Sequence, residues 1–80
     1  MEIKVLGTGC SKCKKLEAAV QEAVAKTGVA AQVTKVTDIQ EIMSFGVMST
    51  PALVIDGSVK SSGRVLSVND VAALIEGAAN

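Results

Sequence analysis

Two cysteines separated by only two residues, in the segment Cys10-Ser11-Lys12-Cys13, constrain this chain more than any other feature. They are its only cysteines, and the chain contains no histidine. A disulfide between them would close too short a loop to add much to the stability of the fold. Histidine-based triads and histidine-containing zinc sites are excluded. The fold must therefore rest on a hydrophobic core, and chemistry explains the cysteine pair better than cross-linking does.

That core has to be small and aliphatic. The 80 residues leave room for one domain, spanning 1–80, and 49% of them are hydrophobic, but Phe45 is the only aromatic residue. We expect Met43 and Met48 to fill the core rather than to bind metal. The near absence of aromatic residues argues against nucleic-acid-binding modules that stack bases on aromatic side chains.

The charges and the N-terminal segment give no sign of a nucleic-acid or membrane partner. Eight basic residues balance eight acidic ones, so no overall field favours DNA or an anionic membrane. The first residues do not resemble a signal peptide, and no apolar stretch is long enough to span a bilayer. We therefore expect a cytoplasmic protein.

The pattern of apolar residues predicts alternating strands and helices. Residues 52–55 are apolar at every position, as in a strand covered on both faces, and Asp56-Gly57 favours a tight hairpin turn after it. The order is β-α-β-α-β-β-α, an α/β fold with a four-stranded mixed sheet and helices on both faces. The expected strands are 1–6, 29–36, 52–55 and 59–62, and the expected helices are 11–27, 39–45 and 67–77.

The cysteine pair lies where the first strand gives way to the first helix. A spacing of three residues places both sulfurs on one side of the first helical turn, within reach of a disulfide. Cys10 lies beside unpaired backbone N–H groups at the positive end of the helix dipole, which favours its thiolate. Cys13 shares a helix face with the apolar Leu16 and Val20. We therefore expect Cys10 to be the nucleophile and Cys13 the shielded, resolving cysteine.

Three lysines next to the pair could tune its chemistry. Lys12, Lys14 and Lys15 add positive charge that would lower the pKa of Cys10 further, and Glu17 partly offsets this charge. The simpler interpretation, which we weigh more heavily, is an ordinary solvated helix face.

Two segments together resemble the thioredoxin and glutaredoxin superfamily. They are residues 9–14, with the sequence GCSKCK, and residues 47–57, with the sequence VMSTPALVIDG. With the element order, they resemble more narrowly the small thioredoxin-like redox-active disulfide proteins of archaea and bacteria, over essentially the whole chain. The resemblance implies that Pro51 follows a cis peptide bond beside the dithiol and that Thr50 presents its backbone to a substrate. A trans proline at the start of a strand is the simpler alternative.

The resemblance implies thiol-disulfide oxidoreductase activity without a bound cofactor. Cys10 would attack a substrate disulfide, and Cys13 would resolve the mixed disulfide that forms. A disulfide-containing protein or a small thiol would be the substrate. Because the chain lacks a dinucleotide-binding fingerprint, a thioredoxin-reductase-like protein would supply the electrons.

Some residues depart from the family pattern. The residues between the cysteines are Ser11-Lys12, unlike those of typical thioredoxins or glutaredoxins. The strand before the site carries Lys4 and no acid that aligns with the family's proton acceptor. The segment Ser62-Gly63-Arg64 only loosely resembles the glutathione site of glutaredoxins, so the use of glutathione stays open.

Two other functions stay open. The loop Gly7-Thr8-Gly9-Cys10, with Cys13, also resembles the Gly-Met-Thr-Cys-x-x-Cys loop of heavy-metal-associated domains, in which two thiolates hold Cu(I) or another soft metal. Those domains end in a strand, whereas this sequence predicts a final helix. A non-catalytic domain with a vestigial or oxidation-sensing dithiol is the other alternative, which turnover of a disulfide substrate would separate from an enzyme.

Overall fold

The element order in the structure is the predicted one. The computed structural model describes residues 1–79. Its elements are β1 (Glu2–Leu6), α1 (Ser11–Thr27), β2 (Gln32–Val36), α2 (Ile39–Ser44), β3 (Ala52–Ile55), β4 (Ser58–Ser62) and α3 (Val68–Ala79). The predicted α/β class is confirmed. The predicted bounds were wrong by more than one residue at two places: β2 begins at Gln32 rather than at Val29, and α3 continues past Gly77 to Ala79. The other ends agree to within one residue.

The four strands form one mixed sheet in the order β2-β1-β3-β4. Strands β1 and β2 are parallel, while β3 is antiparallel to both β1 and β4. The turn between β3 and β4 has positive φ angles at Asp56 (48°) and Gly57 (81°), as a type I′ hairpin turn requires. The predicted parallel pair, the hairpin and the mixed sheet are therefore confirmed.

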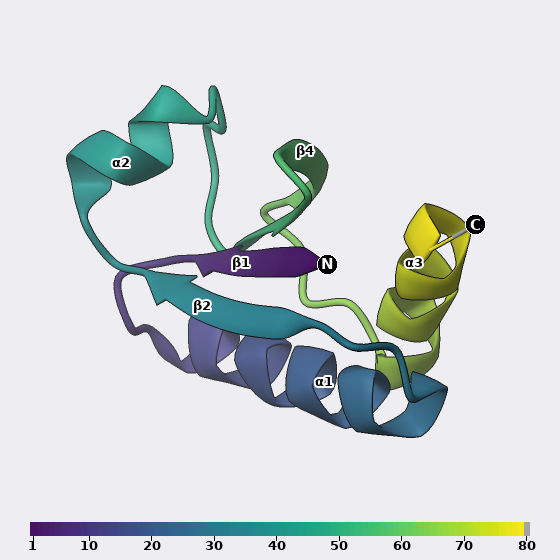
Figure 1. Cartoon of the computed structure of the whole chain (residues 1–80). Helices are drawn as coiled ribbons and strands as arrows, with labels where there is room; N and C mark the ends of the chain where they lie inside the picture. Colours follow the sequence, from purple (N-terminus) through teal and green to yellow (C-terminus); the bar gives the residue numbers. More distant parts are fainter. Residues whose placement is uncertain (80) are drawn as a thin grey trace.

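Helices cover both faces of the sheet (Figure 1). Helices α1 and α3 pack on one face, and the shorter α2 lies on the other. Every residue of β3 is buried, because β3 is an inner strand covered on both faces. The buried residues of the α1 and α3 layer include Ile3, Val5, Leu16, Val20, Leu53, Ile55, Val71 and Ile75. Those of the α2 layer are Leu6, Val36, Ile42, Ala52 and Val54.

Local capping fixes the helix ends that the sequence predicted. Helix α1 ends at Gly28, which has a φ of 69° and donates its N–H to the carbonyl oxygen of Val24. The carboxylate of Asp38 accepts the N–H of Gln40 at the start of α2. The hydroxyl of Ser67 caps α3 in the same way. Within residues 1–79, no helix combines the length and the apolar character needed to cross a membrane.

The two methionines near α2 do not fill the core, so that prediction was wrong. Met43 is 67% exposed and Met48 is 97% exposed. Helix α2 has only six residues, and the single side chain that it buries is that of Ile42. Met48 lies in the loop between α2 and β3, where Phe45 and Val47 supply the apolar contacts with the core.

Candidate active site

Cys10 is the N-cap residue of α1. Its backbone is extended (φ −68°, ψ 167°), and its sulfur accepts the N–H of Cys13 at 3.3 Å. Its carbonyl oxygen accepts the N–H of Lys14, the first backbone bond of the helix. A cysteine thus occupies a position where a side-chain acceptor normally satisfies the unpaired N–H groups of the first turn. The sulfur of Cys10 consequently lies at the positive end of the helix.

The two cysteines differ sharply in exposure. Their sulfur atoms are 2.6 Å apart and hydrogen-bonded, and either thiol can be the donor. Both thiols are free. Cys10 is exposed, whereas only 5% of the surface of Cys13 is exposed to solvent. The structure therefore provides one sulfur that solvent can reach and a second, shielded sulfur in contact with it.

The hydrogen bonds between the cysteines shift their pKa values in opposite directions. The side-chain hydrogen bond from Cys13 lowers the pKa of Cys10 most, and the backbone N–H of Cys13 lowers it further. Burial raises the pKa of Cys13, and its hydrogen bond with Cys10 raises it as well. The first thiol to ionise is therefore the exposed one.

The three lysines that the sequence singled out are all exposed. Only the backbone N–H of Lys12 is among the groups that lower the pKa of Cys10, and the ammonium groups of Lys12, Lys14 and Lys15 are not. Their exposure fits the solvated helix face that we weighed more heavily. A contribution of their charges to the chemistry of Cys10 stays a prediction.

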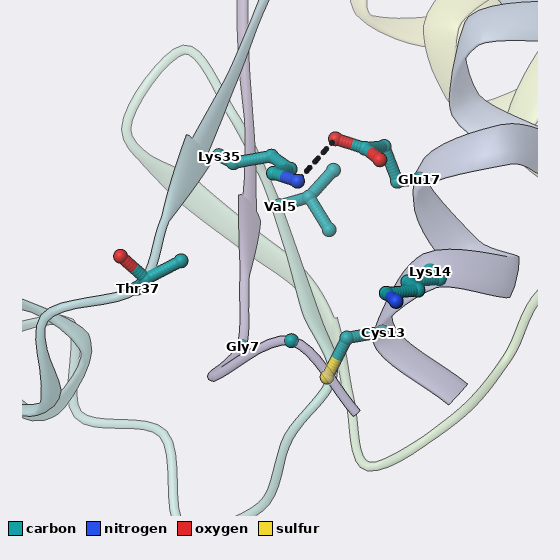
Figure 2. A pocket seen from close by; sticks show the side chains of 8 residues that line it. Val5, Gly7, Cys13, Lys14, Glu17, Lys35 and Thr37 are labelled. Atoms are coloured by element: carbon teal, nitrogen blue, oxygen red, sulfur yellow. Dashed lines mark ion pairs between the residues drawn. The ribbon is translucent and has the colours of Figure 1, made fainter. Parts of the chain in front are cut away.

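Gly7 is the residue against which the buried cysteine packs. A Cβ atom on Gly7 would overlap the sulfur of Cys13 and lie 3.0 Å from its Cβ. Figure 2 shows the Cys13 sulfur pointing toward Gly7. The N–H of Gly7 donates to the carbonyl oxygen of Val36 at 2.9 Å, which ties the loop to the end of β2. The sequence did not predict this contact, which only a residue without a side chain permits.

Thr50 and Pro51 lie at the same end of the sheet as the loop that leads to the cysteines. Leu6 pairs with Ala52, so Gly7, which follows β1, and Pro51, which precedes β3, are neighbours across the antiparallel pair. The Thr50–Pro51 peptide bond is cis, Pro51 is buried, and Thr50 is exposed. The fold therefore brings the two predicted substrate-binding residues to the end of the sheet where α1 begins.

Gly63 supports the loop that carries Thr50. It has a φ of 72°, and a Cβ atom on it would lie 2.9 Å from the Cβ of Ser49. Its N–H donates to the carbonyl oxygen of Pro51 at 2.8 Å. The turn at the end of β4 therefore packs directly on the segment before β3, a role that the sequence did not reveal.

A small cavity of about 20 Å³ lies beside Cys13 (Figure 2). Two of the residues that line it form an ion pair, with the ammonium nitrogen of Lys35 3.5 Å from a carboxylate oxygen of Glu17. The sequence pointed to Glu17 only as a charge that offsets the lysines, and it did not point to Lys35. The cavity is lined by Val5, Gly7, Gly9, Cys13, Lys14, Glu17, Lys35 and Thr37.

The chain offers few ligands for a metal ion. Within the described residues, no three or more histidine, cysteine, aspartate or glutamate side chains gather where they could hold one. The two cysteines supply a pair of sulfurs, which suits linear Cu(I) coordination alone. The final element is helix α3 rather than the strand of heavy-metal-associated domains.

We expect the pKa of Cys10 to rise when its hydrogen-bond donor is removed. Cys13→Ala eliminates the largest cause of the lowered pKa, whereas Cys13→Ser keeps a hydroxyl donor and should raise it less. The pH dependence of alkylation by iodoacetamide measures both effects. Identical profiles for Cys13→Ala and the parent would contradict this account. A variant with glutamine at Lys12, Lys14 and Lys15 tests the prediction that the charges of these lysines lower the pKa of Cys10.

Comparisons with known proteins agree with this geometry. A family model described as a thioredoxin domain matches residues 1–76. A thioredoxin of Methanothermobacter thermautotrophicus is 37% identical over 71 residues, which cover 89% of this chain and 92% of that protein. A thioredoxin of Methanocaldococcus jannaschii is 36% identical over 69 residues, covering 86% and 79%. The comparisons give the soft-metal alternative no support. The chain therefore belongs to the thioredoxin family and is a thiol-disulfide oxidoreductase.

Proposed function

We propose that the chain exchanges disulfides of proteins or small molecules through the dithiol of Cys10 and Cys13. The observation that carries this proposal is the pair of free sulfurs 2.6 Å apart on one helical turn, one exposed and one buried. An exposed thiol with a lowered pKa is suited to attack, since the thiolate is the nucleophile. A shielded thiol beside it can then complete the reaction within the protein.

The exchange takes two steps. The thiolate of Cys10 attacks one sulfur of the substrate disulfide, and the other substrate sulfur leaves with the electron pair. Cys13 then attacks Cys10, which releases the second substrate sulfur and joins the two cysteines in a disulfide. The substrate gains two electrons, and the dithiol loses them.

Thr50 and Pro51 are proposed to position the substrate. Thr50 is exposed at the end of the sheet where α1 begins, and an extended substrate segment can pair with its backbone. Gly63, which follows β4, packs against Ser49 of this loop and donates its N–H to the carbonyl oxygen of Pro51. Reduction of the resulting Cys10–Cys13 disulfide is assigned to a thioredoxin-reductase-like donor.

Trapping of a mixed disulfide tests the proposal. Cys13→Ser keeps the nucleophile but removes the second thiol, so it should remain joined to a model protein disulfide through Cys10. Intact mass spectrometry detects the adduct, and dithiothreitol should release it. The variant with serine at both Cys10 and Cys13 is the control and should form none. An adduct of equal yield in that control would refute the proposal.

A further inference from the structure

Gly7 is a glycine that its own backbone conformation does not require. Five of the seven glycines have a positive φ, which disfavours any side chain, and Gly7 is not among them. Gly77 is the other exception, but a Cβ atom there would meet no atom within 4 Å. A Cβ atom on Gly7 would overlap the sulfur of Cys13. The need for glycine at this position therefore comes from the buried cysteine.

The backbones on both sides of this contact are held in place. Gly7 directly follows β1, and its N–H donates to the carbonyl oxygen of Val36 at 2.9 Å. Cys13 belongs to the buried face of α1, which continues with Leu16 and Val20, both completely buried. A side chain on residue 7 would therefore be accommodated by the Cys13 sulfur, which can swing about the bond between its Cα and Cβ atoms.

Such a swing would separate the two sulfurs of the dithiol. They are 2.6 Å apart in the structure. Staggered side-chain positions lie about 120° from one another, so the Cys13 sulfur cannot move to a different one and keep this contact. To resolve a mixed disulfide, the attacking sulfur must lie close to the Cys10 sulfur and in line with the bond that breaks.

We propose that Gly7 is a positioning residue for the resolving step, because its missing side chain leaves the Cys13 sulfur in contact with Cys10. This inference rests on the proposed function. Gly7 and Cys13 line the same small cavity, and the sulfur points toward Gly7 (Figure 2). The place that a side chain of residue 7 would fill is thus the place that the resolving sulfur occupies.

The resolving step conserves atoms and electrons without Gly7. The proton of Cys13 passes to solvent, and the resulting thiolate forms a bond to the Cys10 sulfur. The bond from Cys10 to the substrate breaks, and the substrate sulfur leaves with the electron pair. Gly7 acts only on where the Cys13 sulfur lies when this occurs. Its effect should therefore remain when Cys13 is fully ionised.

The test follows the reaction of the reduced protein with an equimolar amount of 5,5′-dithiobis(2-nitrobenzoate) by stopped flow. Cys10 releases the first thionitrobenzoate, and the attack of Cys13 releases the second. Gly7→Ala should slow the second release by roughly a hundredfold, the scale on which misplacing a reacting group by about 1 Å acts. This slowing should persist at alkaline pH, because position rather than ionisation limits the attack.

The pKa of Cys10 provides a second readout. The side-chain hydrogen bond from Cys13 lowers this pKa most, so Gly7→Ala should raise it, as Cys13→Ala does. The pH dependence of the first release measures the change. The urea midpoint should fall only slightly, since the swing of one side chain relieves the overlap with the sulfur. A purely structural role would instead lower the midpoint and leave the pKa of Cys10 and the second release unchanged.

Two further variants control for the substitution itself. Gly77→Ala makes the same change within α3, where nothing meets the new side chain, and should leave both releases unchanged. Cys13→Ala removes the sulfur, so adding Gly7→Ala to it should lower the urea midpoint less than Gly7→Ala does alone. This comparison serves if Gly7→Ala does not fold. Folding restored by Cys13→Ala would support the inference, and a failure to fold in both variants would refute it.

The outcomes separate this inference from the proposed function. A parental second release in Gly7→Ala, or a slowing that disappears at alkaline pH, would overturn the role of Gly7. A second release at the parental rate in Cys13→Ser would instead refute the proposed function. If Cys13→Ser blocks that release and Gly7→Ala does not slow it, only the role of Gly7 fails.

Discussion

Cys10→Ser is expected to reduce turnover with a model protein disulfide to below about one-thousandth of the parental rate, because a serine hydroxyl cannot form the mixed disulfide. The change removes the only exposed thiol and leaves the buried Cys13 behind it. Steady-state reduction of the model disulfide, with dithiothreitol as the electron source, measures the loss.

The fold itself should tolerate this substitution. Serine is a favoured N-cap residue, so its hydroxyl can accept the N–H of Cys13 in place of the Cys10 sulfur. Urea denaturation should therefore give a free energy of unfolding close to that of the reduced parent. Turnover within tenfold of the parental rate would mean that Cys13 can be the primary nucleophile and that our assignment of roles is inverted.

Leu16→Ala is expected to lower the free energy of unfolding by about 3 kcal/mol, the usual cost of emptying a leucine-sized site in a core. Leu16 is completely buried one turn after Cys13, in the layer formed by α1 and α3. A domain of this size has a thin core, and its total stability is of the order of 5 kcal/mol. Urea denaturation of the reduced protein measures the change.

An exposed residue of similar size provides the matched control. Ile39 is 61% exposed at the start of α2, so Ile39→Ala should change the free energy of unfolding by no more than about 0.5 kcal/mol. Similar losses for Leu16→Ala and Ile39→Ala would show that the layer between α1 and the sheet does not dominate the stability.

The element order could be predicted because each element carries a local signal. The bounds of α1 follow from its periodic apolar face and from Gly28, and the hairpin follows from Asp56-Gly57. The start of β2 could not be predicted, because Val29 is β-branched but the ladder with β1 begins only where Gln32 meets Glu2. Strand pairing, rather than the propensity of the residues, decides where that strand begins.

The exposed methionines show a second limit of the sequence. Apolar composition predicts burial, but the number of buried positions depends on how much of an element touches the sheet. Helix α2 is too short to bury more than Ile42, which leaves Met43 in solvent. Gly77 was expected to end α3, yet it lies within that helix, where a glycine is tolerated at a cost of about 1 kcal/mol.

The candidate site shows the same contrast between features that a local sequence pattern predicts and contacts that depend on how the elements pack. The cysteine pair could be predicted because its two members lie on one turn of one helix. The contact between Gly7 and Cys13 and the ion pair between Glu17 and Lys35 join different parts of the chain. They exist because α1 packs on the sheet beside β2, and no local pattern around either residue specifies a partner.

The capping of α1 by a cysteine has a consequence for the direction of electron flow. The hydrogen bonds to the Cys10 sulfur exist in the reduced, folded protein and disappear on unfolding. The disulfide closes a loop so short that it hardly restricts the unfolded chain. Groups that stabilise the reduced fold therefore raise the reduction potential, by about 30 mV for every 1.4 kcal/mol. Folding should make this dithiol a stronger oxidant than the same two cysteines in an unfolded peptide.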